Sequence, residues 1–382
     1  MVMKMNELLK NIEKFIIDNE CLTTAMLKTS SLKTIIRCYS SLCCNKISEF
    51  TIAFNKLFKE KSECKNDLLC SIIEDITLFE KAENILHNDS LYIQTKRIAE
   101  FNKATITTSV AKCTLDKNIY ILKCYDYFIY IFNKHDKKCY MLIKPNKKSL
   151  TMVNILLLTP YLMYGNLYAV HGGLVNKNNY NILINNSSLG GKTTFALLFA
   201  THGWNIITEE TTYINSEGSI LPYNIRNYFN IRAGTYLAFK DFFLNKNIIH
   251  DDFLAMEHQT ENELFDYGKK TQFSIDFDEL GSRIKYEDMK ITHSLKVSIE
   301  KSRKLDIQKC SPTENVNSFL ELSLAPTVLL FQDLLNYQIT DKEERKNNLT
   351  KIFNNTSSFI LKSGFDYKEN FETILNKIEI KN

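Results

Sequence analysis

The feature that most constrains this chain is a short apolar run that leads into a glycine-rich turn and then into a second apolar segment. Residues 181–184 read Asn-Ile-Leu-Ile, and the stretch from Asn186 to Thr193 reads Asn-Ser-Ser-Leu-Gly-Gly-Lys-Thr. Apolar residues follow at Phe195 and Leu198, so the sequence predicts a strand, a loop and a helix in that order. A Gly-Gly turn with a surface lysine is the simpler alternative, but it explains neither the strand before the loop nor the apolar helix after it. The pattern favours an α/β fold in which the helix begins at the edge of a sheet.

The loop has the chemistry of a Walker A phosphate-binding loop. Its backbone N–H groups can point inward at phosphate oxygens, and the helix N-terminus adds positive potential. Lys192 stands where the pattern places a lysine on the terminal phosphates, and Thr193 stands where it places a hydroxyl on Mg²⁺. Asn186 replaces the first glycine, and asparagine tolerates a left-handed backbone better than most residues. The sequence predicts ATP and Mg²⁺ as cofactors, bound by Asn186, Ser187, Ser188, Gly190, Gly191, Lys192, Thr193 and Thr194.

Two adjacent glutamates follow the next predicted strand. Gly203 is placed to end the helix, residues 204–208 form the strand, and Glu209 and Glu210 come directly after it. One carboxylate could coordinate Mg²⁺ while the other accepts the proton of an attacking hydroxyl, and a solvated charged turn is the alternative. We expect both glutamates to be catalytic and Glu210 to join Thr193 as a metal ligand, and the sequence leaves open which glutamate is the base.

These elements resemble the family of HPr kinase/phosphorylases and their bacterial relatives, which includes kinases of peptides, proteins and free amino acids. Residues 171–175, His-Gly-Gly-Leu-Val, are similar to the family's His-Gly-x-Leu-Val, and the loop follows after a short turn and strand. Residues 203–210 match the family's helix-end glycine, strand and paired Asp-Asp. Residues 222–235, which include Arg226 and Arg232, are similar to a stretch of the relatives that carries basic residues near the active site.

The resemblance covers about residues 112–325 and implies an ATP- and Mg²⁺-dependent kinase that transfers the γ-phosphoryl group to a hydroxyl. It places His171 beside the transferred group as a catalytic residue, together with Lys192, and Arg226 and Arg232 near the substrate. The implied acceptor is a serine or threonine of a peptide or protein. A free small molecule such as an amino acid is the alternative acceptor.

Departures from the family's pattern keep other functions open. Asn186 and Leu189 stand where the family has glycines, and Glu209-Glu210 stand for Asp-Asp. No counterpart is found for the C-terminal segment that supports the reverse phosphorolysis, so that activity is not expected. A non-catalytic ATP-binding switch or pseudokinase that acts through its N-terminal region is the first rival, and a plain ATPase is the second.

The length of 382 residues predicts two domains, and the resemblance implies an α/β nucleotide-binding domain with a mixed sheet. Residues 1–105 show helical spacing and are interpreted as a helical N-terminal region that packs or docks a partner. Residues 106–382 are interpreted as an HPr-kinase-like kinase domain, with a β-rich segment at 112–145, a core at 165–325 and C-terminal helices. Three β-rich runs predict an antiparallel meander, at 119–124, 127–132 and 139–143, and residues 370–380 predict a terminal helix.

The composition of the chain limits the classes of partner that we expect it to bind. The chain has 382 residues, 44% of them apolar and 24% charged, as in ordinary globular proteins. The formal net charge of +4 is small and the lysines alternate with acids, so neither a nucleic-acid nor a membrane partner is expected. The start lacks a signal peptide, and the ten cysteines are therefore interpreted as reduced thiols of a cytoplasmic protein. A homo-oligomer is compatible with the sequence.

Overall fold

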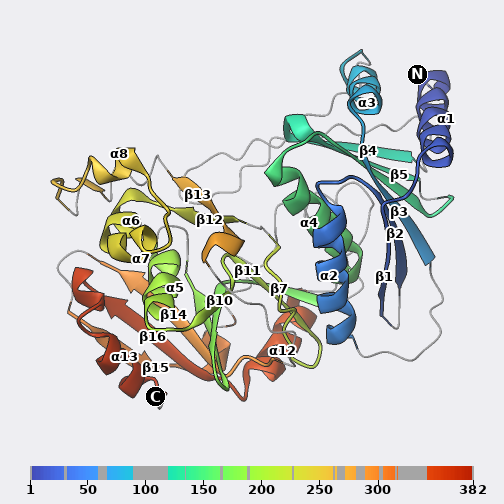
Figure 1. Cartoon of the computed structure of the whole chain (residues 1–382). Coiled ribbons are helices and arrows are strands. Elements are labelled where there is room, and N and C mark those ends of the chain that lie inside the picture. The colour runs from blue at the N-terminus through green and yellow to red at the C-terminus, as the bar shows by residue number, and fades with distance from the viewer. Residues whose placement is uncertain are drawn as a thin grey trace. The chain divides into compact units, whose positions relative to one another are not determined.

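The chain folds into two compact units of mixed α/β structure (Figure 1). The first comprises Met1–Asn166 and Pro326–Ile339, and the second comprises Leu167–Ala325 and Thr340–Asn382. The computed structural model describes residues 2–29, 32–58, 67–88, 119–133, 135–163, 167–186, 190–225, 228–260, 263–264, 272–280, 289–300, 304–314, 316 and 342–380.

The first unit is built on a six-stranded mixed sheet with the order β1-β2-β3-β6-β5-β4. Strands β2, β3 and β6 are parallel, while β4, β5 and β6 form an antiparallel meander and β1 pairs antiparallel with β2. The elements of this unit are α1 (Val2–Asp18), β1 (Thr23–Lys28), β2 (Lys33–Tyr39), α2 (Cys44–Leu57), β3 (Asp67–Glu74), α3 (Ile76–Asn88), β4 (Ile119–Cys124), η1 (Tyr125–Tyr127), β5 (Phe128–Asn133), β6 (Lys138–Ile143) and α4 (Lys147–Met163).

The periodicity of the N-terminal region predicts helices throughout. The region also supplies three strands of this sheet, so the prediction is wrong in part. Strand β3 explains the difference: Cys70, Ile72 and Ile73 are fully buried, and Ser71 between them is 1% exposed. A strand covered on both faces reads as a continuous apolar run, which fits helical spacing as well as strand spacing. The predicted meander is confirmed, but β6 pairs with β3, so its strands complete the N-terminal sheet and the predicted boundary at 105/106 differs from that between the units.

The second unit contains another six-stranded mixed sheet, with the order β10-β8-β9-β14-β16-β15. Strands β9, β14 and β16 are parallel, β8 is antiparallel to β9, and β10 is antiparallel to β8, so β10 runs in the direction of β9. Its elements are β7 (Leu167–His171), β8 (Gly173–Lys177), β9 (Tyr180–Asn185), α5 (Lys192–Thr201), β10 (Asn205–Thr208), β11 (Thr211–Asn215), β12 (Tyr228–Ile231), α6 (Ala233–Ala238), α7 (Lys240–Leu244), α8 (Asp251–Leu254), β13 (Phe273–Asp276), η2 (Phe277–Leu280), β14 (His293–Ile299), β15 (Asp306–Lys309), α12 (Lys342–Phe353), β16 (Ser357–Ser363), η3 (Phe365–Tyr367) and α13 (Phe371–Lys377).

This topology brings the carboxyl ends of β9, β10, β14 and β16 to one edge of the sheet. The predicted strand before the loop, the helix after it and the strand before the glutamates are confirmed as β9, α5 and β10. The C-terminal part is not only helical, because β16 lies between α12 and α13 and pairs inside the sheet.

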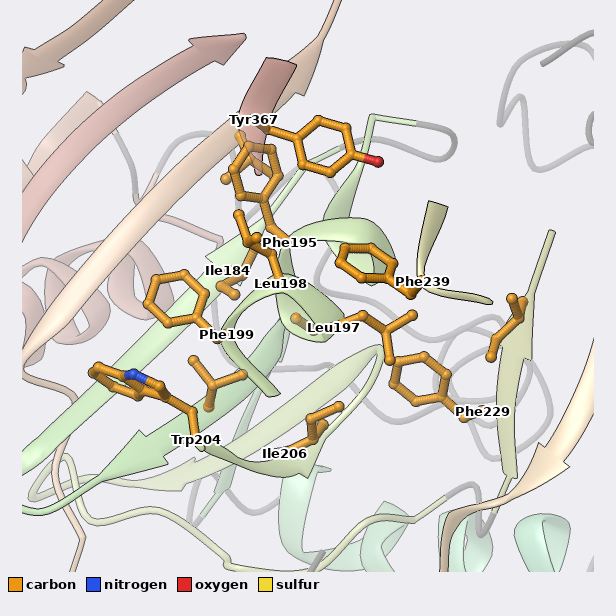
Figure 2. Close-up of a cluster of buried hydrophobic side chains, with 14 of the residues drawn as sticks. Ile184, Phe195, Leu197, Leu198, Phe199, Trp204, Ile206, Phe229, Phe239 and Tyr367 are labelled. Atoms are coloured by element: carbon orange, nitrogen blue, oxygen red, sulfur yellow. The ribbon is translucent and has the colours of Figure 1, made fainter. Parts of the chain in front are cut away.

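Helix α5 is the centre of the core of the second unit. Its residues 194–199 are all buried, as expected for a helix that is apolar on every side. Figure 2 shows Phe195, Leu197 and Phe199 of this helix surrounded by other apolar side chains, among them Trp204 and Phe229. Because the helix is enclosed, its N-terminus is held firmly at the sheet edge.

Among the described cysteines, seven are free thiols: Cys21, Cys38, Cys43, Cys44, Cys70, Cys139 and Cys310. Burial raises the pKa of Cys38 to about 11 and that of Cys43 to about 12. These two thiols stay protonated at neutral pH and act as core residues rather than as nucleophiles. No described helix combines the length and the apolar character needed to cross a bilayer.

We expect Phe199→Ala to destabilise the second unit by about 3–5 kcal/mol, because removing a fully buried ring leaves a cavity. The ring lies 5.0 Å from that of Trp204 and 5.3 Å from that of Phe371. Trp204 is the one tryptophan of the chain, so its fluorescence during urea unfolding reports this unit. Phe242→Ala removes a partly buried ring and should cost clearly less. Equal losses for the two variants would contradict this account of the core.

Candidate functional site

The loop between β9 and α5 ends in a glycine that no other residue could replace without strain. Gly191 has a φ of 98° and occupies the N-cap position of α5. A Cβ atom added to it would lie 2.8 Å from Cγ1 of Ile299, which is closer than real Cβ contacts. The predicted loop residues Ser187 and Ser188, with Leu189, lie outside the described residues.

Asn186 acts through its side chain. Its Nδ2 donates a hydrogen bond to the Gly190 carbonyl at 3.2 Å and another to the Val297 carbonyl on β14. The left-handed backbone expected for Asn186 is not found: among the described non-glycine residues, φ is positive only at Lys137, Asn178, Asn247 and Glu379. A glycine could not form these bonds, so asparagine closes the loop by joining its two ends to each other and to the neighbouring strand.

Lys192 and His171 meet at the loop. The Lys192 ammonium lies 2.9 Å from Nε2 of His171 and donates to the Asn186 carbonyl at 2.8 Å. An ammonium has no acceptor, so the ring nitrogen of His171 accepts, and the imidazole is neutral in this contact. His171 is the last residue of β7 and pairs with Thr211 on β11, which fixes its place beside the loop. Two residues predicted from separate segments are thus in direct contact.

The two glycines after His171 allow the chain to turn against the end of β10. A Cβ atom on Gly173 would lie 2.8 Å from the Glu209 carbonyl oxygen, so a side chain there would push β10 away. Thr212 donates from Oγ1 to the Gly172 carbonyl at 2.9 Å, and its hydroxyl lies 2.8 Å from that of Thr208. No local pattern marks these two buried threonines, because their contacts depend on the pairing of distant strands.

Glu209 is the glutamate that faces α5. It is 8% exposed, and Oγ1 of Thr193 donates to its Oε1 at 3.4 Å. Glu210, the next residue, is more exposed than Glu209. The contact puts Glu209 beside the threonine hydroxyl, and the predicted pairing of Glu210 with Thr193 stays a prediction.

Arg232 lies just before α6, whose first turn touches that of α5. The hydroxyl of Thr235 on α6 is 3.0 Å from that of Thr194 on α5. Arg232 is partly buried, and burial lowers the pKa of its guanidinium from its ordinary value. A partly buried cation is stabilised by an anion, which a nucleotide or an acidic substrate would supply. Arg226, the other predicted substrate residue, lies outside the described residues.

A hydroxyl and a carboxylate are the donors that Mg²⁺ prefers. Within the described ranges, no group of three or more His, Cys, Asp or Glu residues could hold a metal ion. Mg²⁺ differs from metals bound in all-protein cages, because it is commonly held by one or two carboxylates together with substrate phosphates and water. Thr193 and Glu209 therefore fit a Mg²⁺ ion that arrives with a nucleotide, and they do not form a complete site alone.

Comparison of the chain with protein-family models and with curated proteins gives no match. The resemblance to HPr kinase/phosphorylases therefore rests on the sequence motifs alone.

We expect Gly191→Ala to destabilise the protein more than Gly203→Ala. Gly203 also has a positive φ, of 81°, but nothing lies within 4 Å of a Cβ atom added there. Both variants should lose about 1–2 kcal/mol from the left-handed backbone. The clash with Ile299 should cost Gly191→Ala about 1–3 kcal/mol more. Urea unfolding followed by circular dichroism measures the difference, and the same loss in both variants would contradict the contact with Ile299.

Proposed function

We propose that the chain is an ATP- and Mg²⁺-dependent kinase of the HPr-kinase-like kind, with its phosphate-binding loop between β9 and α5. The observation that carries the proposal is the contact between Lys192 and His171 at 2.9 Å. A lysine at the start of a helix beside a histidine from another strand forms a cationic and hydrogen-bonding centre where phosphate oxygens would bind. The hydroxyl–carboxylate pair of Thr193 and Glu209 at the same sheet edge supports the proposal further.

Each residue then has a chemical role. The loop N–H groups bind the phosphates, and Lys192 exchanges the Asn186 carbonyl and His171 for phosphate oxygens. Thr193 and Glu209 would hold Mg²⁺, which would supply positive charge to the bound phosphates. Arg232 supplies a second cation for the phosphates or for an acidic acceptor.

In the transfer step, the acceptor hydroxyl oxygen attacks the γ-phosphorus and forms the new P–O bond. The bond from the γ-phosphorus to the oxygen that bridges it to the β-phosphate breaks, and ADP leaves with that electron pair. Glu210, which is more exposed than Glu209, takes the proton of the hydroxyl. The proposed acceptor is a serine or threonine of a peptide or protein, for which the first unit would provide a docking surface.

Turnover tests the proposal directly. With Mg²⁺, ATP, and pooled peptides and free amino acids, the intact chain should form ADP in an acceptor-dependent way. Lys192→Ala should lower the rate about 100-fold or more by removing a charge from the developing transition state. Glu210→Gln should lower it by about 100- to 10,000-fold by removing the base. Glu217→Gln, the same change at an exposed turn after β11, should have no effect.

The other outcomes of this assay identify the rivals. Phosphate release that needs no acceptor would show that the chain is an ATPase and not a kinase. Binding of ATP without turnover under any of these conditions would show that the chain is a nucleotide-binding switch and not a kinase.

Glu209→Gln tests the metal side of the site separately. Because its carboxylate lies beside the Thr193 hydroxyl, the substitution should raise the Mg²⁺ concentration needed for half-maximal ATP binding by about 10- to 100-fold. Calorimetric titration of ATP at several Mg²⁺ concentrations measures this, and Glu217→Gln is again the matched control. An unchanged Mg²⁺ requirement would remove Glu209 from the metal site.

A further inference from the structure

Strand β10 contains one residue more than the part of β8 that it pairs with. Ile206 lies opposite Val175 of β8. Thr208, two residues further along β10, lies opposite Leu174, which is the immediate neighbour of Val175. The register therefore shifts at Ile207, which is the extra residue. An insertion of this kind is a β-bulge, and bulges are often found beside functional sites, where they re-aim a side chain.

The bulge puts two consecutive side chains of β10 on the same face of the sheet. Ile206 packs in the apolar cluster around α5 (Figure 2). Ile207 belongs to a different cluster on the opposite face, together with Leu174. Residues directly opposite each other on paired strands share a face, so Thr208 lies on the face of its partner Leu174. Both Ile207 and Thr208 therefore lie on the face away from α5.

Regular alternation along β10 would turn Glu209 away from α5. Side chains of a strand alternate between the two faces, and a shift of one residue moves every later side chain to the other face. Counted from Ile206 on the α5 face, alternation would put Thr208 on that face and Glu209 on the far one. The bulge reverses this order, and Glu209 meets the hydroxyl of Thr193 on α5. The bulge thus accounts for the side on which the carboxylate lies.

Two buried hydroxyls hold the bulge in place. The hydroxyls of Thr208 and Thr212 lie 2.8 Å apart, and both residues are fully buried. Thr212 donates to the Gly172 carbonyl at 2.9 Å, and because a hydroxyl has one proton, Thr208 is the donor to Thr212. Thr212 is itself fixed by the pairing of β11 with β7, in which it lies opposite Val170. The bulge is therefore joined to a strand pair outside its own sheet.

We propose that Thr208 and Thr212 are positioning residues, which hold the bulge of β10 so that Glu209 faces Thr193 and can bind Mg²⁺; this rests on the proposed function. The two threonines act through Glu209. A hydrogen bond between buried hydroxyls has a defined length and direction, and apolar contacts alone do not fix a strand in this way. Groups that orient a metal-binding side chain typically contribute about 10- to 100-fold to metal affinity.

The Mg²⁺ requirement of ATP binding tests the assignment. Thr208→Val keeps the shape of the side chain and removes its hydroxyl, so the Mg²⁺ concentration needed for half-maximal ATP binding should rise about 10-fold. Thr208→Ser keeps the hydroxyl and should stay near the value of the intact chain. Thr212→Val should raise the requirement at least as far, because it also removes the bond to Gly172. Calorimetric titration of ATP at several Mg²⁺ concentrations measures each value.

Two further variants distinguish positioning from a general loss of stability. Thr356→Val removes another buried threonine hydroxyl of the second unit, which donates to the Ile291 carbonyl at 3.4 Å just before β16. Any loss of stability in this variant, measured by urea unfolding, should leave its Mg²⁺ requirement unchanged. In the Glu209→Gln background, Thr208→Val should cause no further rise, because two changes that act through one carboxylate are not additive.

The outcomes separate the two proposals. Failure of the intact chain to bind ATP would overturn the proposed function and this assignment together. If the intact chain binds ATP with Mg²⁺ and Thr208→Val has the same Mg²⁺ requirement, the positioning role alone is overturned. A further rise in the Glu209→Gln background would also overturn it, because the threonine would then act on the site by a route other than Glu209.

Discussion

The burial of α5 is the constraint on which the rest of the second unit depends. Residues 194–199 of this helix are all buried, so the helix must be covered by the sheet on one side and by other apolar residues on the remaining sides. Its first turn is then placed where β9 ends. Lys192 and Thr193 belong to that turn, and His171, Asn186 and Glu209 touch it, so the position of these groups follows from the packing of α5.

Once α5 is fixed, a few polar contacts hold the described ends of the loop beside the neighbouring strands. Asn186 ties the loop to β14, and Lys192 ties it to β7. Both bonds use side chains that lie on or next to the loop and partners that come from far along the chain. The described ends of the loop, Asn186 and Gly190 to Lys192, are therefore held in place by bonds within the protein.

The elements around the loop could be predicted from sequence because their signals are local. β9, α5 and β10 each have an uninterrupted apolar run, and Gly203 marks the end of the helix. The first unit could be predicted only in part, since β3 is buried on both faces and its run resembles a helix. The left-handed backbone predicted for Asn186 is wrong, because a backbone preference can be read from a sequence and a bond to Val297 cannot. The bond to Val297 depends on the parallel pairing of β9 with a strand more than a hundred residues away, for which there is no local signal.

The position of β16 has a consequence for how the protein is made. This strand lies inside the sheet, between β14 and β15, although it is the last strand of the chain. The loop after β9 and helix α5 therefore leave the ribosome long before the strand that completes the sheet beside them. Until residue 363 has emerged, the apolar surface of β14 and α5 lacks part of its cover, and the nascent chain depends on chaperones or on rapid synthesis to keep that surface from aggregating.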